Sequence, residues 1–348
     1  MSVQSIPESP SAAHSAAPPP HVVLLQTTLF AMWGAQVASA AAQLGLADFI
    51  ASGVHASDDL AREAAADPAA LYRLLRACAT IGLVVETSPR RFALTPVGEC
   101  LRSDRPGSMR DIVIAETAPG HWLPWGRLVD AVRKGGPMTR ETLGVEAWDY
   151  YAQNQDEGRC FARAMSNLSA VASADVARVY NASGAQRIVD VGGSEGVLLR
   201  ALLDAAPAAR GVLFDRADVI EGVRAKGVHH DRMEIVAGDF FQSVPAGGDL
   251  YLLKSILHDW PDDACVSILK TIHAHAADGA KVLIVEMVMP EEPQPTPVAL
   301  MDMNMLVMLG GRERTPREFG QLLAAGGFMV DRVIPTGGMF SVIEAHRT

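Results

Sequence analysis

Cysteine is scarce in this 348-residue chain: there are four, and no two of them form a C-x-x-C pair. Cys78, Cys100, Cys160 and Cys265 are widely separated, which argues against a zinc site and favours reduced thiols in a cytoplasm. Positive charge is also limited, because the chain has 30 Lys and Arg residues against 40 Asp and Glu, which gives a formal net charge of -10. Nucleic-acid binding depends on Lys and Arg at phosphates, so we expect no nucleic-acid partner. We also expect no metal cofactor.

Long apolar runs are missing as well. No continuous run reaches the roughly 18 residues that span a bilayer, so we expect no membrane partner. Residues 1–20 are rich in Pro, Ser and Ala and lack the basic start and apolar segment of a secretory signal, which predicts a disordered leader. The remaining composition, 49% hydrophobic and 20% charged, is typical of a core-forming cytoplasmic enzyme or binding protein. The length predicts two domains.

Residues 21–115 are rich in alanine and predict a helical first domain. Apolar residues keep helical spacing between Leu24 and Leu46. The further elements we expect are helices over 60–66 and 71–81, followed by a β-hairpin of 84–86 and 91–94 around a four-residue turn. Helices followed by a hairpin have the outline of a winged helix.

A winged helix often binds DNA, and that alternative has to be weighed. The candidate recognition helix carries only Arg73 and Arg76 among mostly apolar residues. Such a face is better suited to burial against another protein surface. We therefore favour a dimerisation module over a DNA-binding one.

Residues 116–348 predict an α/β catalytic domain. Apolar strand candidates alternate with helical segments from residue 187 onward, which indicates right-handed crossovers and a mostly parallel, Rossmann-like sheet. The candidate strands are 187–191, 211–214, 233–236, 249–254, 281–288, 330–334 and 340–345. Ligands of such sheets bind at the carboxyl ends of the strands.

The first candidate cofactor feature is the glycine-rich turn DVGGSEG, which follows the first of these strands. Glycines are needed where a ligand approaches the backbone too closely for a Cβ. A dinucleotide site would have the pattern G-x-G-x-x-G, but Val191 occupies its first position. A pyrophosphate ligand, and with it an NAD-dependent oxidoreductase, is therefore disfavoured.

Two acidic residues follow the next two strands. Asp215 ends the second strand, where a carboxylate can accept hydrogen bonds from the ribose hydroxyls of a nucleotide-like ligand. Asp239 follows the third strand and is succeeded by Phe240. The carboxylate of Asp239 suits the edge of an adenine ring, and the aromatic ring of Phe240 suits its face. Either Asp alone would be interpreted as a turn or helix cap, but the pair favours an adenosine-containing ligand.

His258 is the candidate catalytic base. It lies in LKSILHDWPDD, where the fourth strand ends and a helix begins with Pro261 in its first turn. A neutral imidazole with a pKa near the operating pH suits removal of a hydroxyl proton. Glu286, at the end of the fifth strand, and Glu313, in GGRERT, are the candidate carboxylates that orient the ring. The plain alternative is a loop histidine with two surface-paired acids.

The chain resembles the plant caffeic acid O-methyltransferase type and its bacterial small-molecule relatives over nearly its whole length. The motifs that carry the resemblance are DVGGSEG, GDFF, LKSILHDWPDD, the Glu of VEMVMP and GGRERTPREF. LKSILHDW combined with GGRERT is specific, whereas the glycine turn is not. The resemblance implies S-adenosylmethionine (SAM) as cofactor, a homodimer formed through the N-terminal domain, and O-methylation of a small aromatic hydroxyl compound.

The resemblance also implies individual roles. His258 matches the base, with Glu286 and Glu313 bracketing it. The expected SAM-binding residues are Gly192, Asp215, Asp239, Phe240, Lys254, Met165 and Ser169.

The segment 301–308 is rich in methionine and one residue shorter than in the plant enzymes, and we expect Met305 and Asp302 near the substrate. Such a stripe is more often core than pocket. A catalytically idle SAM-binding regulator and N- or C-methylation are the remaining alternatives.

Overall fold

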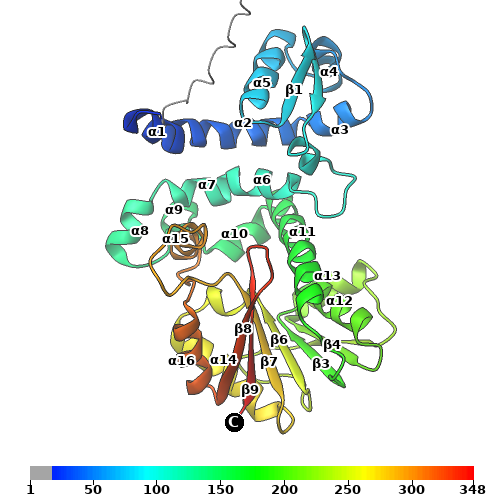
Figure 1. Ribbon diagram of the computed structural model, residues 1–348, viewed down its shortest axis with the longest axis vertical. Coiled ribbons are helices and arrows are strands. Elements are labelled where there is room, and N and C mark those ends of the chain that lie inside the picture. The colour runs from blue at the N-terminus through cyan, green and yellow to red at the C-terminus, as the bar shows by residue number, and fades with distance from the viewer. Residues whose placement is uncertain (1–17) are drawn as a thin grey trace, which may run out of the picture.

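The computed structural model describes residues 18–348. Most of the expected disordered leader, 1–17, therefore lies outside the described residues. Figure 1 shows three layers along the long axis: an N-terminal helical domain, a middle layer of short helices, and a sheet flanked by helices.

The N-terminal domain follows the predicted order of helices and hairpin. Its elements are α1 (Pro20–Leu25), the π-helical turn η1 (Gln26–Phe30), α2 (Ala31–Gln43), α3 (Leu46–Ala51), α4 (Ser57–Glu63), α5 (Pro68–Thr80), β1 (Val84–Ser88), β2 (Arg91–Leu94) and η2 (Gly98–Leu101). The side chain of Asp67 accepts a hydrogen bond from the N–H of Ala70 and caps α5. The hairpin turn is shorter than predicted, because β1 continues to Ser88 and Arg90 adopts a positive φ of 62°.

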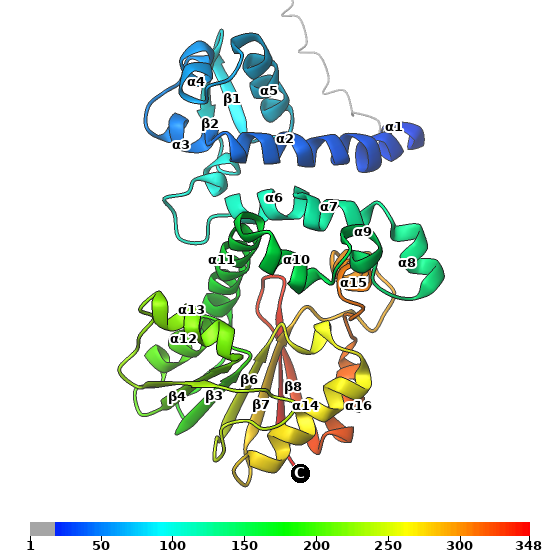
Figure 2. The ribbon, with the colours of Figure 1, turned by 180° about the vertical axis from the view of Figure 1, so that it is seen from behind.

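The middle layer covers one edge of the sheet (Figures 1 and 2). It consists of α6 (Arg110–Thr117), α7 (Pro119–Trp125), α8 (Leu128–Lys134), α9 (Thr139–Leu143), α10 (Ala147–Gln153) and the upper part of α11 (Gln155–Val179). Helix α15 (Val298–Met308), which is distant in sequence, packs beside α7 in this layer.

The sheet has seven strands in the order β5-β4-β3-β6-β7-β9-β8. The strands are β3 (Arg187–Val191), β4 (Arg210–Asp215), β5 (Met233–Ala237), β6 (Leu250–Lys254), β7 (Lys281–Glu286), β8 (Phe328–Pro335) and β9 (Ser341–Arg347). Strands β3 to β7 are parallel, whereas β9 pairs antiparallel with both β7 and β8. The predicted mostly parallel sheet is thereby confirmed.

Both faces of the sheet are buried, which explains why its strands are continuously apolar in sequence. Val189 and Val191 of β3 pack with α14 (Asp262–His275) and α16 (Pro316–Ala325) on one face. Ile188 packs with α11, α12 (Val197–Ala205) and α13 (Ala217–Ala225) on the other. The strand order reverses between β3 and β6, and their carboxyl ends point toward the middle layer (Figure 1). A ligand site is expected at this switch point.

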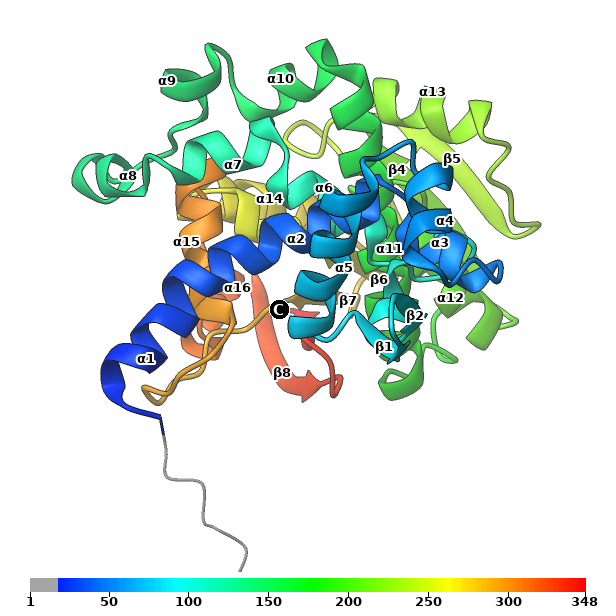
Figure 3. The ribbon, with the colours of Figure 1, turned by 90° about the horizontal axis from the view of Figure 1, so that it is seen from above.

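The first helix is unusually exposed. Helices α1, η1 and α2 run on as one rod across the molecule (Figure 3), with exposed apolar side chains that include Leu24, Phe30 and Trp33. By length and composition alone, Pro20–Gln43 would suffice to cross a membrane. This helix contains no long continuous apolar run, because its polar residues are spread along it, and the expectation of no membrane partner rested on such runs alone.

Candidate active site

A short 3₁₀ turn, η3 (Leu257–Asp259), presents His258 at the carboxyl end of β6. The chain leaves the strand through Ser255, whose φ of 54° is unusual for a residue other than glycine. The backbone N–H groups of Ile256 and Leu257 each donate to Oε1 of Glu286 at 3.0 Å. The last residue of β7 therefore fixes the turn that carries the imidazole. Pro261 is the N-cap residue that precedes α14, so the prediction that it lies in the first turn of this helix is wrong.

The imidazole of His258 lies between two buried carboxylates. Its Nδ1 is 2.9 Å from Oε1 of Glu313 and 3.6 Å from Oε2 of Glu286. When Nδ1–H donates to Glu313, the Nε2 of a neutral ring carries no proton and has a free lone pair. Nε2 lies 3.4 Å from Oδ1 of Asp259. In this tautomer the basic nitrogen is Nε2, on the side of the ring away from Glu313.

Opposing influences act on the acidity of this cluster. Burial lowers the pKa of His258, but the negative charges of Glu286, Glu313 and Asp259 outweigh it and raise that pKa to about 10. Burial raises the pKa of Glu286 to about 7, although the charge of His258 opposes this. A cationic ring is therefore strongly stabilised here, which favours the state after proton transfer but disfavours the neutral ring that must come before it. The expectation of a pKa near the operating pH is not met in this resting arrangement.

Arg314 holds both sides of the His258 turn, and its side chain is fully buried. Its Nη1 donates to the carbonyl of Leu257 and its Nη2 to the carbonyl of Trp260, both at 2.8 Å. Its Nε and Nη2 also donate to Oδ1 of Asp262, at 3.0 and 2.8 Å. Arg314 is not among the predicted site residues, although its position next to Glu313 in GGRERT was a signal for it.

Asp302 joins the cluster by supporting Glu313. Its Oδ1 accepts a hydrogen bond from the backbone N–H of Glu313 at 2.8 Å. Met305 lies one helical turn further along α15 and is buried. Glu286 and Glu313 each keep one buried oxygen, Oε2, that has no hydrogen-bond partner among residues 18–348.

The glycine turn approaches the His258 turn closely. Gly192 has a φ of 70°, and a Cβ added there would lie 2.5 Å from Cδ1 of Ile256 and 3.8 Å from the ring of Phe240. A side chain at position 192 would therefore collide with Ile256 of the His258 turn, at the point where the strand order reverses. These neighbours bring the glycine turn, Phe240 and the catalytic turn to one place.

The two predicted adenosine ligands are held differently. Asp215 is tied to the glycine turn, since its Oδ2 accepts from the N–H of Ser194 at 2.8 Å. Burial is the main reason why the pKa of Asp215 is raised. Asp239 is exposed, and its carboxylate accepts from the N–H of Phe241 and from Nε2 of Gln242, so it stabilises its own turn.

Lys254 reaches across to α11. Its Nζ donates to Oγ of Ser169 at 2.8 Å, and burial lowers the pKa of this ammonium group while Asp190 opposes the shift. Ser169 follows Met165 by four residues and therefore shares its helix face. The structure thus joins the predicted Lys254 and Ser169 directly and places Met165 on the same side of α11.

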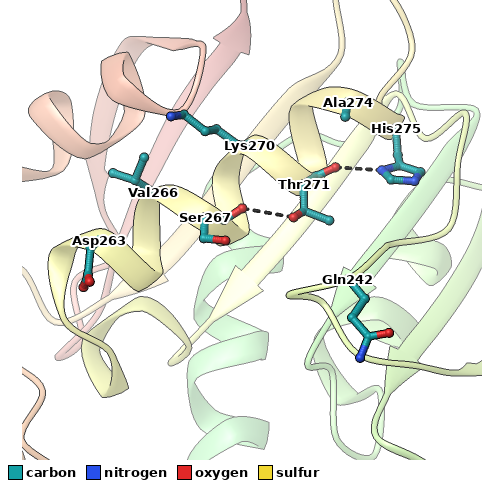
Figure 4. A pocket seen from close by; sticks show the side chains of 8 residues that line it. All are labelled: Gln242, Asp263, Val266, Ser267, Lys270, Thr271, Ala274 and His275. Carbon is teal, nitrogen blue, oxygen red and sulfur yellow. Dashed lines mark hydrogen bonds between the residues drawn. The ribbon is translucent and has the colours of Figure 1, made fainter.

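One pocket of the structure lies away from the predicted site. A shallow hollow on α14, shown in Figure 4, is lined by residues such as Ser267, Lys270 and His275 and includes none of the predicted site residues.

Within the described chain, one ligand atom from each of His258, Glu286 and Glu313 lies within 4.8 Å of the others, a spacing that would suit a cation. The 2.9 Å hydrogen bond between His258 and Glu313 already occupies that space.

The fold and the site define a SAM-dependent methyltransferase. A model of the O-methyltransferase domain matches residues 125–329, and a model of the O-methyltransferase dimerisation domain matches residues 27–104. The chain belongs to this O-methyltransferase family. Both the predicted family and the predicted cofactor class are thereby confirmed.

Similar proteins cover nearly the whole chain. Phenazine O-methyltransferase of Lysobacter antibioticus is 36% identical over 327 residues, which are 93% of this chain and 95% of that protein. Mitomycin biosynthesis 6-O-methyltransferase of Streptomyces lavendulae is 33% identical over 353 residues and covers both chains fully. The structure of human N-acetylserotonin methyltransferase with SAM aligns with a TM-score of 0.88 at 26% identity, over 97% of this chain and 99% of that one. N-methyltransferases also occur among the relatives.

We predict that Glu313→Gln lowers the pKa of His258, because it removes a negative charge 2.9 Å from Nδ1. NMR titration of the histidine ring protons measures the change, with His258→Gln identifying the resonance. Glu234→Gln, an exposed site on β5, is the matched control and should leave the titration unchanged. An unaltered His258 pKa in Glu313→Gln would contradict the electrostatic role of Glu313.

Proposed function

We propose that this SAM-dependent O-methyltransferase methylates a hydroxyl of a small aromatic secondary metabolite, with His258 as general base. The observation that carries the proposal is the hydrogen bond from Nδ1 of His258 to buried Glu313, which leaves Nε2, 3.4 Å from Oδ1 of Asp259, as the nitrogen that can accept a proton. Phenazine and mitomycin in the names of two relatives support a ring-containing acceptor of similar size.

The residues of the chain perform the proton chemistry. The bound cofactor supplies an electrophilic methyl group on a sulfonium. As the acceptor oxygen forms its bond to that methyl group, Nε2 of His258 takes the hydroxyl proton. Glu313 and Glu286 stabilise the resulting imidazolium, and Asp302 keeps Glu313 in position. The neutral ring is the reactive form, so turnover should rise with pH until His258 has lost its proton.

The cofactor roles in this proposal belong to the switch-point residues. Gly192 would lie against the cofactor, and buried Lys254 keeps further N–H donors besides the one on Ser169. Asp215 would bind the ribose hydroxyls. Asp239 and Phe240 would hold adenine, while Met165 and Ser169 would close over the ligand from α11.

The acceptor would lie against Met305 and Asp302 on α15. An amine acceptor is the second possibility, because N-methyltransferases occur among the relatives. A neutral amine attacks without a base, however, and the carefully oriented His258 therefore favours a hydroxyl.

We further propose a cytoplasmic homodimer that assembles through the N-terminal domain. The match of residues 27–104 to a dimerisation domain supports this assembly, as does the exposed apolar side of α1 to α2. We retain the boundaries 21–115 for that domain and 116–348 for the catalytic domain.

His258→Gln should lower kcat on the preferred acceptor by about 10²- to 10⁴-fold, since the general base is lost. Calorimetry should show SAM binding nearly unchanged, because His258 does not belong to the proposed cofactor site. His229→Gln, with 75% of its side chain exposed, is the matched control. Turnover like that of the wild type in His258→Gln would exclude the base role. A wild-type protein that binds SAM but methylates no hydroxylated aromatic would favour an idle regulator.

Asp215→Ala should weaken SAM binding by about 10- to 100-fold, the loss expected for hydrogen bonds to a charged group. Calorimetric titration with SAM gives the affinity directly. Asp231→Ala, at a side chain 94% exposed, serves as the control and should bind SAM normally. Equal affinity in the two variants would reject the ribose assignment.

Trp33→Glu should shift the assembly toward monomer, because it places a charge on the exposed apolar face of α2. Light scattering during gel filtration should give twice the 37.0 kDa chain mass for the wild type. Met339→Glu, another exposed apolar site, should remain a dimer. A monomeric wild type that sediments with lipid vesicles would contradict the proposal and point to membrane attachment.

A further inference from the structure

A second buried histidine, His121 on α7, lies outside the catalytic cluster and is 4% exposed. Its Nε2 is 3.0 Å from Oε2 of Glu116 and 3.0 Å from Oδ1 of Asn304. Its Nδ1 is 3.4 Å from the hydroxyl of Tyr151. A neutral ring satisfies these contacts when Nε2–H donates to the two oxygens and Tyr151 donates to Nδ1. Together His121, Glu116, Asn304 and Tyr151 form what we call the His121 cluster.

The orientation of the Asn304 amide follows from Trp125. The indole Nε1 is a donor only, and it lies 2.8 Å from Oδ1 of Asn304, so the amide oxygen must face it. The amide nitrogen, Nδ2, then points the other way. Its contact within the described chain is the sulfur of Met301 at 3.9 Å, which is a weak acceptor. Asn304 therefore has amide donors available for another molecule.

Glu116 has acceptor capacity to spare. Its Oε2 contacts His121, and 39% of its side chain is still reached by solvent. Burial raises the pKa of this carboxyl group, so the group is enclosed and yet still accessible to solvent. No Lys or Arg side chain contacts the His121 cluster in the structure of residues 18–348.

Helix α11 places the cluster relative to the cofactor site. Phe161, Met165 and Ser169 are spaced by four residues and share one face of the helix. The ring of Phe161 stacks on Tyr151 of the cluster, with ring centroids 4.6 Å apart, while Ser169 binds Lys254. Eight residues of helix separate these two ends, a distance of about 12 Å.

Helix α15 also contacts both ends. Asp302 binds the backbone of Glu313 beside the base, whereas Asn304 points to His121. Helix α11 therefore runs from the catalytic end to the His121 cluster. On α15, Asp302 and Asn304 are two residues apart and leave the helix about 160° apart, with Met301 and Met305 on the arc between them.

We propose that the His121 cluster is a specificity determinant that binds a second polar group of the acceptor, across an aromatic system of two or more fused rings from the methylated hydroxyl. This inference rests on the proposed function. The amide of Asn304 donates to the second group, and Glu116 accepts from it. A carboxamide fits both partners. A carboxylate is disfavoured, because it would face the charge of Glu116 with no cationic side chain of Lys or Arg to offset it.

Three acceptors of matched size test the proposal: 6-hydroxy-2-naphthamide, 6-hydroxy-2-naphthoate and 6-isopropyl-2-naphthol. The full-length wild type should use the amide with a kcat/KM about 10- to 100-fold above that of the isopropyl compound, and should use the carboxylate least. Calorimetry of the three compounds in the presence of S-adenosylhomocysteine should give the same ranking in Kd.

Two variants separate the partners of the second group. Asn304→Leu should make kcat/KM for the amide nearly equal to kcat/KM for the isopropyl compound, mainly by raising the KM of the amide. Glu116→Gln should raise the relative use of the carboxylate by about 10-fold, because it removes the charge but keeps the shape. Glu221→Gln, an exposed position on α13, is the control for Glu116→Gln, and thermal unfolding confirms that each variant is folded.

The outcomes separate this inference from the proposed function. Turnover of all three naphthols at similar kcat/KM, unchanged by both variants, would overturn the inference and leave the proposed function intact. Absence of turnover together with the predicted ranking in Kd would support the inference and count against the O-methyl transfer. Similar Kd values for the three compounds without turnover would contradict both.

Discussion

The site depends on one hydrogen bond, from Nδ1 of His258 to Oε1 of Glu313 at 2.9 Å. It determines which ring nitrogen is free and on which side of the ring a proton is accepted. Much of the surrounding structure serves to keep the two partners in place. Glu286 holds the backbone on one side of His258, Arg314 holds carbonyls on both sides, and Asp302 holds the backbone of Glu313.

The sheet topology explains how a base and a cofactor site come to share one edge. Because strand order reverses between β3 and β6, the glycine turn and the His258 turn leave adjacent strands in the same direction. In the proposed function, the carboxyl ends of the strands carry the reacting groups, and α11 and α15 in the middle layer form the walls against which the acceptor would lie.

The sequence was most informative where function follows strand ends. The strands were predictable because burial on both faces makes them continuously apolar, and His258 and Glu286 stand directly after such runs. Arg314 and the supporting role of Asp302 were missed, since they act on backbone groups that no motif identifies. The His121 cluster could not be predicted from the sequence for another reason. His121 and Asn304 are 183 positions apart, and only the packing of α7 on α15 brings them together.

The unpartnered oxygens of Glu286 and Glu313 have a consequence for how the enzyme balances rigidity against reactivity. A buried oxygen without a hydrogen bond destabilises the folded resting state. Oε2 of Glu286 lies 3.6 Å from Nδ1 of His258, so its negative charge is already beside the ring that becomes an imidazolium in the proposed reaction. In that reaction, little reorientation of dipoles would be needed as the positive charge forms. A site with both oxygens hydrogen-bonded would then be more stable at rest but slower in the proposed reaction.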